Sequence, residues 1–102
     1  MADRANLHEE LCTILGSRNV YFNPPESVRM QYDAIRYNLA GKDIKRANNR
    51  LYHYTNMYEG VVITRDPDTT IPDTILSYFE MCSLGRPYVA DNLNHYPFTL
   101  YY

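Results

Sequence analysis

The first part of the chain carries apolar residues at a helical spacing. They follow one another at i, i+4, i+7 and i+8, namely Leu7, Leu11, Ile14 and Leu15. This spacing predicts an amphipathic helix from Asp3 to Leu15, because residues three and four apart share one face of a helix. Gly16 follows directly, and glycine is the residue that most often ends a helix.

A second helical pattern follows the polar turn at residues 66–70. Thr70 precedes Ile71 and Pro72, an order that suits an N-cap followed by a proline in the first turn. We therefore expect a helix that begins near Ile71. Its apolar face is expected to consist of Ile75, Leu76, Tyr78 and Phe79.

Other segments alternate between apolar and polar residues, which is the pattern of half-buried strands. The clearest alternation covers residues 34–39 and is expected to end at Gly41, before a polar loop from Lys42 to Arg50. A long extended segment follows at about 51–65. We expect a bulge or bend in it near Glu59 and Gly60, where the apolar face changes parity. Shorter strands are expected at 20–22, 88–90 and 96–102.

These elements predict an α+β fold. Two helices and four to five strands, joined by short turns, indicate an antiparallel sheet with both helices packed on one face. Residues 1–102 form one domain in this interpretation, because a chain of 102 residues has room for a single modest core. No stretch is apolar over the roughly 20 residues that a transmembrane helix needs, so we expect no membrane association.

The composition adds an unusual abundance of tyrosine. The chain has 11 Tyr, 3 Phe and no Trp, and its last segment, Tyr96 to Tyr102, is aromatic. Tyrosine combines a large apolar face with a polar tip, which suits half-buried sheet positions and protein interfaces alike. Because soluble proteins normally blunt exposed apolar edges, an unblunted aromatic strand favours a partner that covers it.

The charge balance argues against nucleic acid as the main ligand. A net charge of −2 provides no long-range attraction to phosphate backbones. Basic residues do cluster at Lys42, Lys45, Arg46 and Arg50, but Asp43 interrupts them and the neighbouring residues are polar. We therefore interpret this run as a solvated loop, with no specific nucleic-acid binding.

Nucleophilic and nucleotide-binding motifs are missing from the sequence. No serine lies in a GxSxG context, and the glycines do not form a phosphate-binding loop. Cys12 and Cys82 lack the local patterns of thiol enzymes and are expected to be reduced thiols. We expect no catalytic residue and no cofactor.

Two groups of residues have the chemistry of metal ligands. His8 and Cys12 lie four residues apart, a spacing that arises often by chance. Asp66, Asp68 and Asp73 could supply oxygen ligands, although turn and cap chemistry alone accounts for acidic residues before a helix. We therefore expect no metal site, and we keep a small metal-dependent hydrolase, built on these aspartates and a histidine, as the alternative from another class.

Three stretches of the chain resemble a known family. They are Leu11–Ser27, which contains Asn19-Val20-Tyr21-Phe22-Asn23-Pro24-Pro25-Glu26-Ser27; Ile63–Asp68; and Tyr88–Tyr102, which contains Ala90-Asp91-Asn92-Leu93-Asn94-His95. Together they resemble the tail terminator or tail completion proteins encoded in the structural-gene clusters of tailed bacteriophages. The loop Lys42–Arg50 and the segment Met81–Arg86 depart from the family pattern.

The resemblance implies a non-enzymatic virion protein. Tail terminators are small α+β subunits that form a ring, here expected to have six subunits, on the last ring of tail tube protein. The ring stops tube growth and presents a joining surface to the head-completion or connector protein, and DNA passes through it without specific binding. Such a protein is located in the tail or neck of the virion and is assembled in the cytoplasm of the host bacterium.

A ring requires heterologous contacts between neighbouring subunits. The residues expected to form intersubunit or sheet contacts are aromatic and lie on two strands: Tyr52, Tyr54, Tyr58, Tyr96, Phe98, Tyr101 and Tyr102. A head-closure or connector-adaptor protein of the neck remains the alternative within phage assembly, because the sequence does not distinguish the two roles.

Overall fold

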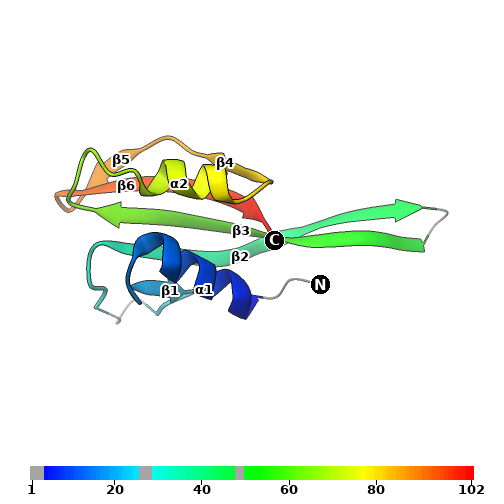
Figure 1. Ribbon diagram of the computed structural model, residues 1–102. Coiled ribbons are helices and arrows are strands. Elements are labelled where there is room, and N and C mark those ends of the chain that lie inside the picture. Colours follow the sequence, from blue (N-terminus) through cyan, green and yellow to red (C-terminus); the bar gives the residue numbers. More distant parts are fainter. Residues whose placement is uncertain (1–3, 26–28, 48–49) are drawn as a thin grey trace.

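Over residues 4–25, 29–47 and 50–102, which the computed structural model describes, the chain folds into two helices and a six-stranded sheet (Figure 1). For residues 42–47 and 50–55 the description is limited to the backbone. In chain order the elements are α1 (Arg4–Leu15), β1 (Val20–Phe22), β2 (Ala34–Ala47), β3 (Arg50–Thr64), α2 (Ile71–Tyr78), β4 (Cys82–Leu84), β5 (Tyr88–Ala90) and β6 (Leu93–Tyr101).

The strands form one sheet in the order β1-β2-β3-β6-β4, and β5 pairs with the other end of β6. The α+β class is confirmed, but two details of the expected sheet are wrong. β4 is an additional strand, too short to show alternation, and β1 runs parallel to β2, whereas the other pairs are antiparallel. Eleven residues separate β1 from β2, close to the dozen or so that return a chain to the start of a parallel neighbour.

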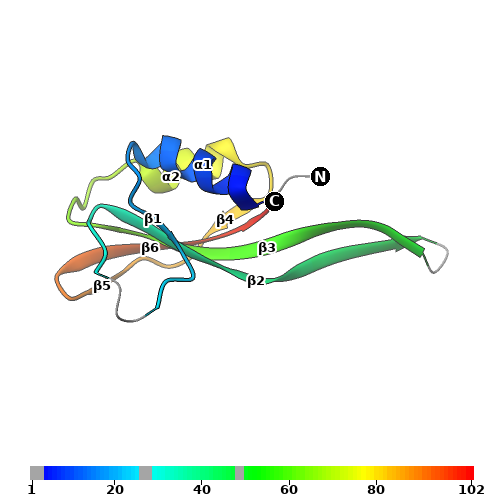
Figure 2. The same cartoon turned by 90° about the horizontal axis from the view of Figure 1, so that it is seen from below.

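Both helices lie on the same face of the sheet, as Figure 2 shows. The main core fills the space between that face and the helices. It consists of Leu7, Leu11, Cys12, Val20, Ile35, Tyr37, Tyr58, Val62, Ile75, Phe79, Phe98 and Leu100. The opposite face, which we call the open face, holds a smaller cluster of Val61, Ile63 and Leu93 with Met30 packed against it.

Both helices begin or end where the sequence signals predict, but one of the predicted capping hydrogen bonds is not made. α1 ends as expected, with Gly16 at φ 82° and its N–H donating to the Cys12 carbonyl over 2.9 Å. α2 begins at Ile71 as expected, but Thr70 makes no side-chain capping bond. Instead the Thr69 hydroxyl accepts a hydrogen bond of 3.3 Å from the Ile71 N–H. The start of a helix is thus easier to place from the sequence than the residue that caps it.

The hairpin between β5 and β6 shows why Asp and Asn lie at this turn. Asp91 and Asn92 have φ values of 54° and 63°. Two consecutive residues with positive φ form the two-residue turn whose twist matches antiparallel strands. Because the turn has only two residues, β6 begins at Leu93, before its expected start at Tyr96.

Strands β2 and β3 continue far beyond the rest of the sheet as a two-stranded ribbon (Figure 1). We call residues 41–47 and 50–56 the arm and the remaining described residues the body. The arm makes the molecule 51 Å long against 27 and 23 Å in the other directions. The expected loop from Lys42 to Arg50 is therefore wrong, since strand runs to Ala47 and resumes at Arg50, while Asn48 and Asn49 fall outside the described residues.

The bulge expected near Glu59 and Gly60 is also absent from the register of β3. The irregularities lie instead between Leu39 and Gly41 and between Lys45 and Arg46 of β2. At Gly60 the sheet has room for no side chain. Its partner on β6 is Phe98, and the ring of Phe98 lies against the position that a Cβ of residue 60 would occupy. The change of parity in the sequence reflects burial on both faces of the sheet, because Val62 lies in the main core whereas Val61 and Ile63 lie in the cluster on the open face.

Candidate assembly interface

The expected interface residues divide between the inside and the surface of the chain. Tyr58 and Phe98 are buried in the main core, so their rings pack against this chain's own sheet and helices and present no surface to a neighbouring subunit. Tyr96, Tyr101 and Tyr102 are half-buried. The side chains of Tyr52 and Tyr54 lie outside the part that the structure describes, and their role stays a prediction.

The half-buried tyrosines make contacts within the chain as well. Tyr102 lies edge-on to Phe79, with 6.1 Å between the ring centroids. The hydroxyl of Tyr96 donates a hydrogen bond of 3.2 Å to the Pro67 carbonyl. Tyr96 and Tyr102 therefore help to hold β6 and the end of the chain against the rest of the body.

The two strands lose their outer neighbours at different levels, first on the β1 side and then, four residues further along β3, on the β6 side. On one side β3 pairs with β6 from Thr64 to Met57, and the last contact consists of two backbone hydrogen bonds between Asn56 and Tyr102, of 3.2 and 3.0 Å. On the other side β1 reaches only Tyr37 of β2. Beyond Asn56, the outer edges of both strands are unpaired among the described residues of the arm.

The junction of arm and body contains a buried polar atom without a partner. Asn56 donates from Nδ2 to the Tyr58 hydroxyl over 3.4 Å, whereas its Oδ1 is buried and accepts no hydrogen bond from the described residues. The register shift between Leu39 and Gly41 lies in the strand opposite, where Lys42 pairs with Asn56. A bulge and a polar side chain thus mark the point where β2 and β3 leave the body.

Charge is distributed unevenly between the two regions. Residues 41–56 contain four basic residues and one acidic residue, a net charge of +3. The rest of the chain therefore carries −5, since the total is −2. This separation gives the arm an electrostatic character opposite to that of the body.

Exposed large apolar side chains gather on α2 and β4. Tyr78 is 55% exposed, Met81 50% and Leu76 43%, and Leu84 in β4 is also exposed. Of the apolar face expected for α2, only Ile75 and Phe79 are buried, because the helix covers the sheet with one narrow stripe. We call Leu76, Tyr78, Glu80, Met81 and Leu84 the α2–β4 surface.

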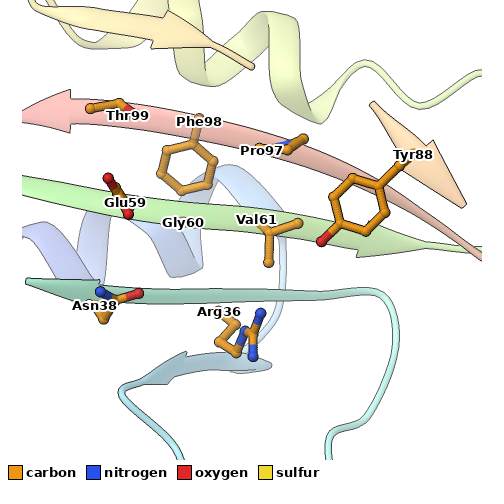
Figure 3. Close-up of a pocket in the computed structure, with 9 residues that line it drawn as sticks. All are labelled: Arg36, Asn38, Glu59, Gly60, Val61, Tyr88, Pro97, Phe98 and Thr99. Atoms are coloured by element: carbon orange, nitrogen blue, oxygen red, sulfur yellow. The ribbon is translucent and has the colours of Figure 1, made fainter. Parts of the chain in front are cut away.

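The open face contains a hollow of about 250 Å³ (Figure 3). Gly60 and Val61 lie in it, with Arg36 on the β2 side, and Tyr88 extends from β5 toward Val61. The ring of Tyr88 stacks on His95 at 4.7 Å. The hollow is smaller than the 300 Å³ or so of a typical ligand pocket, and no histidine or cysteine is among the residues that line it.

The candidate metal ligands do not come together. Among the described residues, no three His, Cys, Asp or Glu side chains form a group that could hold a metal ion. Asp66 Oδ1 accepts a hydrogen bond of 2.9 Å from the Asp68 N–H, which is the turn chemistry considered above. This arrangement gives the hydrolase alternative no geometric support.

His8, Cys12 and Cys82 lie in surroundings that favour their uncharged forms. His8 lies 2.8 Å from the Tyr37 hydroxyl through Nδ1, and burial, together with the charge of Arg4, lowers the pKa of His8. Burial raises the pKa of the Cys12 and Cys82 thiols. Raised pKa values keep thiols protonated and poorly nucleophilic, so neither cysteine has the environment of a reactive thiol.

No protein-family model matches the chain, and no curated protein matches it. The structure contains no helix, within the ranges it describes, whose length and apolar character would let it cross a bilayer. The arm and the α2–β4 surface are the two regions of the structure that bear on its function. The sequence pattern does not indicate the arm because Ile44 is the only large apolar residue among residues 42–47.

Proposed function

We propose that this protein is a structural subunit of a bacteriophage tail, a terminator that forms a ring of six copies. The ring caps the tail tube, stops further addition of tube protein and provides the surface to which the head-completion or connector protein joins. The resemblance carried by residues 19–27 and 90–95 supports the phage assignment. The arm supports the assembly.

The arm is the main structural support for this proposal, because its outer strand edges have no partner within the described part of a single copy. A two-stranded ribbon alone is only marginally stable in water, and unpaired strand edges are sites at which another chain adds. The arm presents two such edges beyond Tyr37 and Asn56 in the described structure. A subunit with this shape has a physical reason to bind other copies.

A ring also suits the asymmetry of the molecule. The arm is basic and projects from an acidic body, so the region that reaches out differs from the surfaces that remain. Contacts between two different surfaces propagate head to tail and close into a ring when the rotation allows it. The same geometry would serve a terminator that holds one face toward the tube and the other toward the connector.

The experiment that tests this function measures mass and shape together. The purified protein, alone and with tail tube protein, is examined by light scattering after size exclusion and by negative-stain microscopy. Six-subunit rings that copurify with the tube protein are expected. A strictly monomeric species at high concentration, with or without tube protein, contradicts the proposal, and copurification with the portal complex instead assigns the protein to the connector.

A further inference from the structure

The α2–β4 surface has the chemistry that a basic, partly apolar arm requires. Its segment, residues 71–84, contains two acidic residues, Asp73 and Glu80, and no basic one. Four of the eight exposed large hydrophobic side chains in the described structure also lie there, on Leu76, Tyr78, Met81 and Leu84. Exposed apolar groups that gather beside charge of one sign are typical of a docking surface.

The arm offers the complementary chemistry. Its sequence contains Lys42, Lys45, Arg46 and Arg50 together with the apolar or aromatic residues Ile44, Leu51, Tyr52 and Tyr54. The arm extends away from the body in both views, and α2 and β4 belong to the body (Figures 1 and 2). The arm therefore reaches outward and does not lie on the α2–β4 surface of its own chain.

From this complementarity we infer that the arm of one subunit docks on the α2–β4 surface of the next copy of the same chain. This inference rests on the proposed ring and names the two surfaces that build it. The contact joins an arm to a different region of the neighbour, so each subunit gives one arm and receives another. β4 is the last strand on its side of the sheet, which leaves its backbone edge open to the incoming strand.

The burial pattern explains why the α2–β4 surface, and not the open face, receives the arm. The open face already covers Val61, Ile63 and Leu93 within the chain, and its hollow is bordered by one basic and one acidic residue, Arg36 and Glu59. A basic arm would therefore meet no excess of acidic charge there. At the α2–β4 surface it meets Glu80 and, nearby on α2, Asp73.

Two variants, one for each side of the contact, test the inference. The arm variant is Lys45→Glu with Arg46→Glu, and its control is Arg29→Glu with Arg36→Glu in the body. The surface variant is Glu80→Lys with Met81→Lys. Its matched control, Glu59→Lys with Val89→Lys, also replaces one exposed acidic and one exposed apolar residue with lysine. Assembly is followed by sedimentation velocity over a range of protein concentrations.

Each variant alone is expected to raise the concentration at half-assembly at least tenfold, while both controls assemble like the unaltered protein. A mixture of the two variants is the sharper test. The arm variant keeps an intact surface and the surface variant keeps an intact arm, so one contact per pair can form. The mixture is therefore expected to give a species of two subunits that does not grow further.

Other outcomes overturn the inference. Rings that persist in either variant show that the altered region is not in the subunit contact, although the ring itself, and with it the proposed function, would stand. Rings of the arm variant that no longer bind a labelled DNA duplex would assign the arm to nucleic acid, and rings of the surface variant that no longer bind tube protein would assign that surface to the tube. A monomeric unaltered protein contradicts the proposed function first.

Folding is checked in every sample by circular dichroism during heating. If a charge reversal lowers the melting temperature, the milder pair Lys45→Gln with Arg46→Gln and Glu80→Gln with Met81→Gln replaces it. These variants remove charge or apolar surface without introducing a charge of the opposite sign. A smaller loss of assembly in the same direction supports the inference, and no loss overturns it.

Discussion

The same two strands behave differently in the body and in the arm. In the body, β2 and β3 lie between other strands and beneath helices, and Ile35, Tyr37 and Val62 are buried. In the arm they have only each other. The comparison shows that a strand is formed by local pairing, but that its stability comes from what covers its faces and edges.

The largest expected effect comes from a core residue of the body. Leu100 is fully buried on β6, between Tyr58 and Cys82 in the register. Leu100→Ala is expected to lower the free energy of unfolding by about 3 kcal/mol, because it removes buried apolar surface and leaves a cavity. The same change at Leu39, which is 47% exposed, is expected to cost less than about 0.5 kcal/mol. Urea denaturation measures both, and equal losses would show that burial of the side chain does not decide the cost of removing it.

A second pair of variants compares glycines at the centre of the sheet and at the base of the arm. In Gly60→Ala the new Cβ would lie 2.8 Å from Cε1 of Phe98, and the ring is held in the core. Overpacking of this kind is expected to cost about 2 kcal/mol. In Gly41→Ala the Cβ would make an ordinary contact of 3.7 Å with Met57 Cε, and the stability is expected to stay level or rise by up to about 1 kcal/mol.

Thermal denaturation of the two glycine variants measures the change in stability that each substitution causes. Destabilisation of Gly41→Ala by as much as Gly60→Ala would show that the base of the arm is packed as tightly as the body. In that case the arm would be an extension of the core and would need no partner.

The sequence predicted the elements of the body better than the arm, for physical reasons. α1 and α2 have apolar stripes and end signals such as Gly16, and β1 and β5 begin and end where expected. These signals are local. The extension of β2 past Gly41 was missed because a register shift follows Leu39, which moves apolar residues to the other parity and ends the visible alternation.

The candidate site could be predicted only in part. The sequence predicts that Tyr58 and Phe98 lie on strands of the sheet, which the structure confirms. It could not show that both rings face this chain's own helices. The α2–β4 surface was missed for the converse reason. Leu76 and Tyr78 have helical spacing with Ile75 and Phe79, and only the packing of α2 decides which of the four are covered.

A smaller effect is expected from pH at the contact between α1 and the body. Arg4 donates to the Tyr37 hydroxyl oxygen over 3.5 Å, which leaves that hydroxyl free to donate to Nδ1 of a neutral His8. Burial lowers the pKa of His8 in the folded chain, with further lowering by Arg4 and Arg18 and an opposing effect of Glu9. The folded state therefore binds fewer protons than the unfolded state just below the ordinary histidine pKa of about 6.5.

The sign of the pH dependence follows from this shift. The stabilisation from neutral His8 is fully present above about pH 6.5 and is lost as the pH falls toward the lowered pKa of the folded state. Urea denaturation at pH 7.5 and at pH 5.5 is expected to show a loss at the lower pH that is smaller in His8→Gln. An unchanged pH dependence in that variant would locate the titrating group elsewhere.

The smallest effect on the stability of a single subunit is expected from shortening the arm. Asp43 and Thr55 are directly paired, so residues 44–54 can be replaced by Asn-Gly, which joins opposed strands through a two-residue turn. Because the described residues among 44–54 pair only with one another, the free energy of unfolding is expected to change by less than about 1 kcal/mol. Assembly, in contrast, should be lost. A loss of more than about 2 kcal/mol in the monomer would mean that the arm stabilises its own body, whereas a stable monomer that no longer assembles would show that the arm acts between subunits.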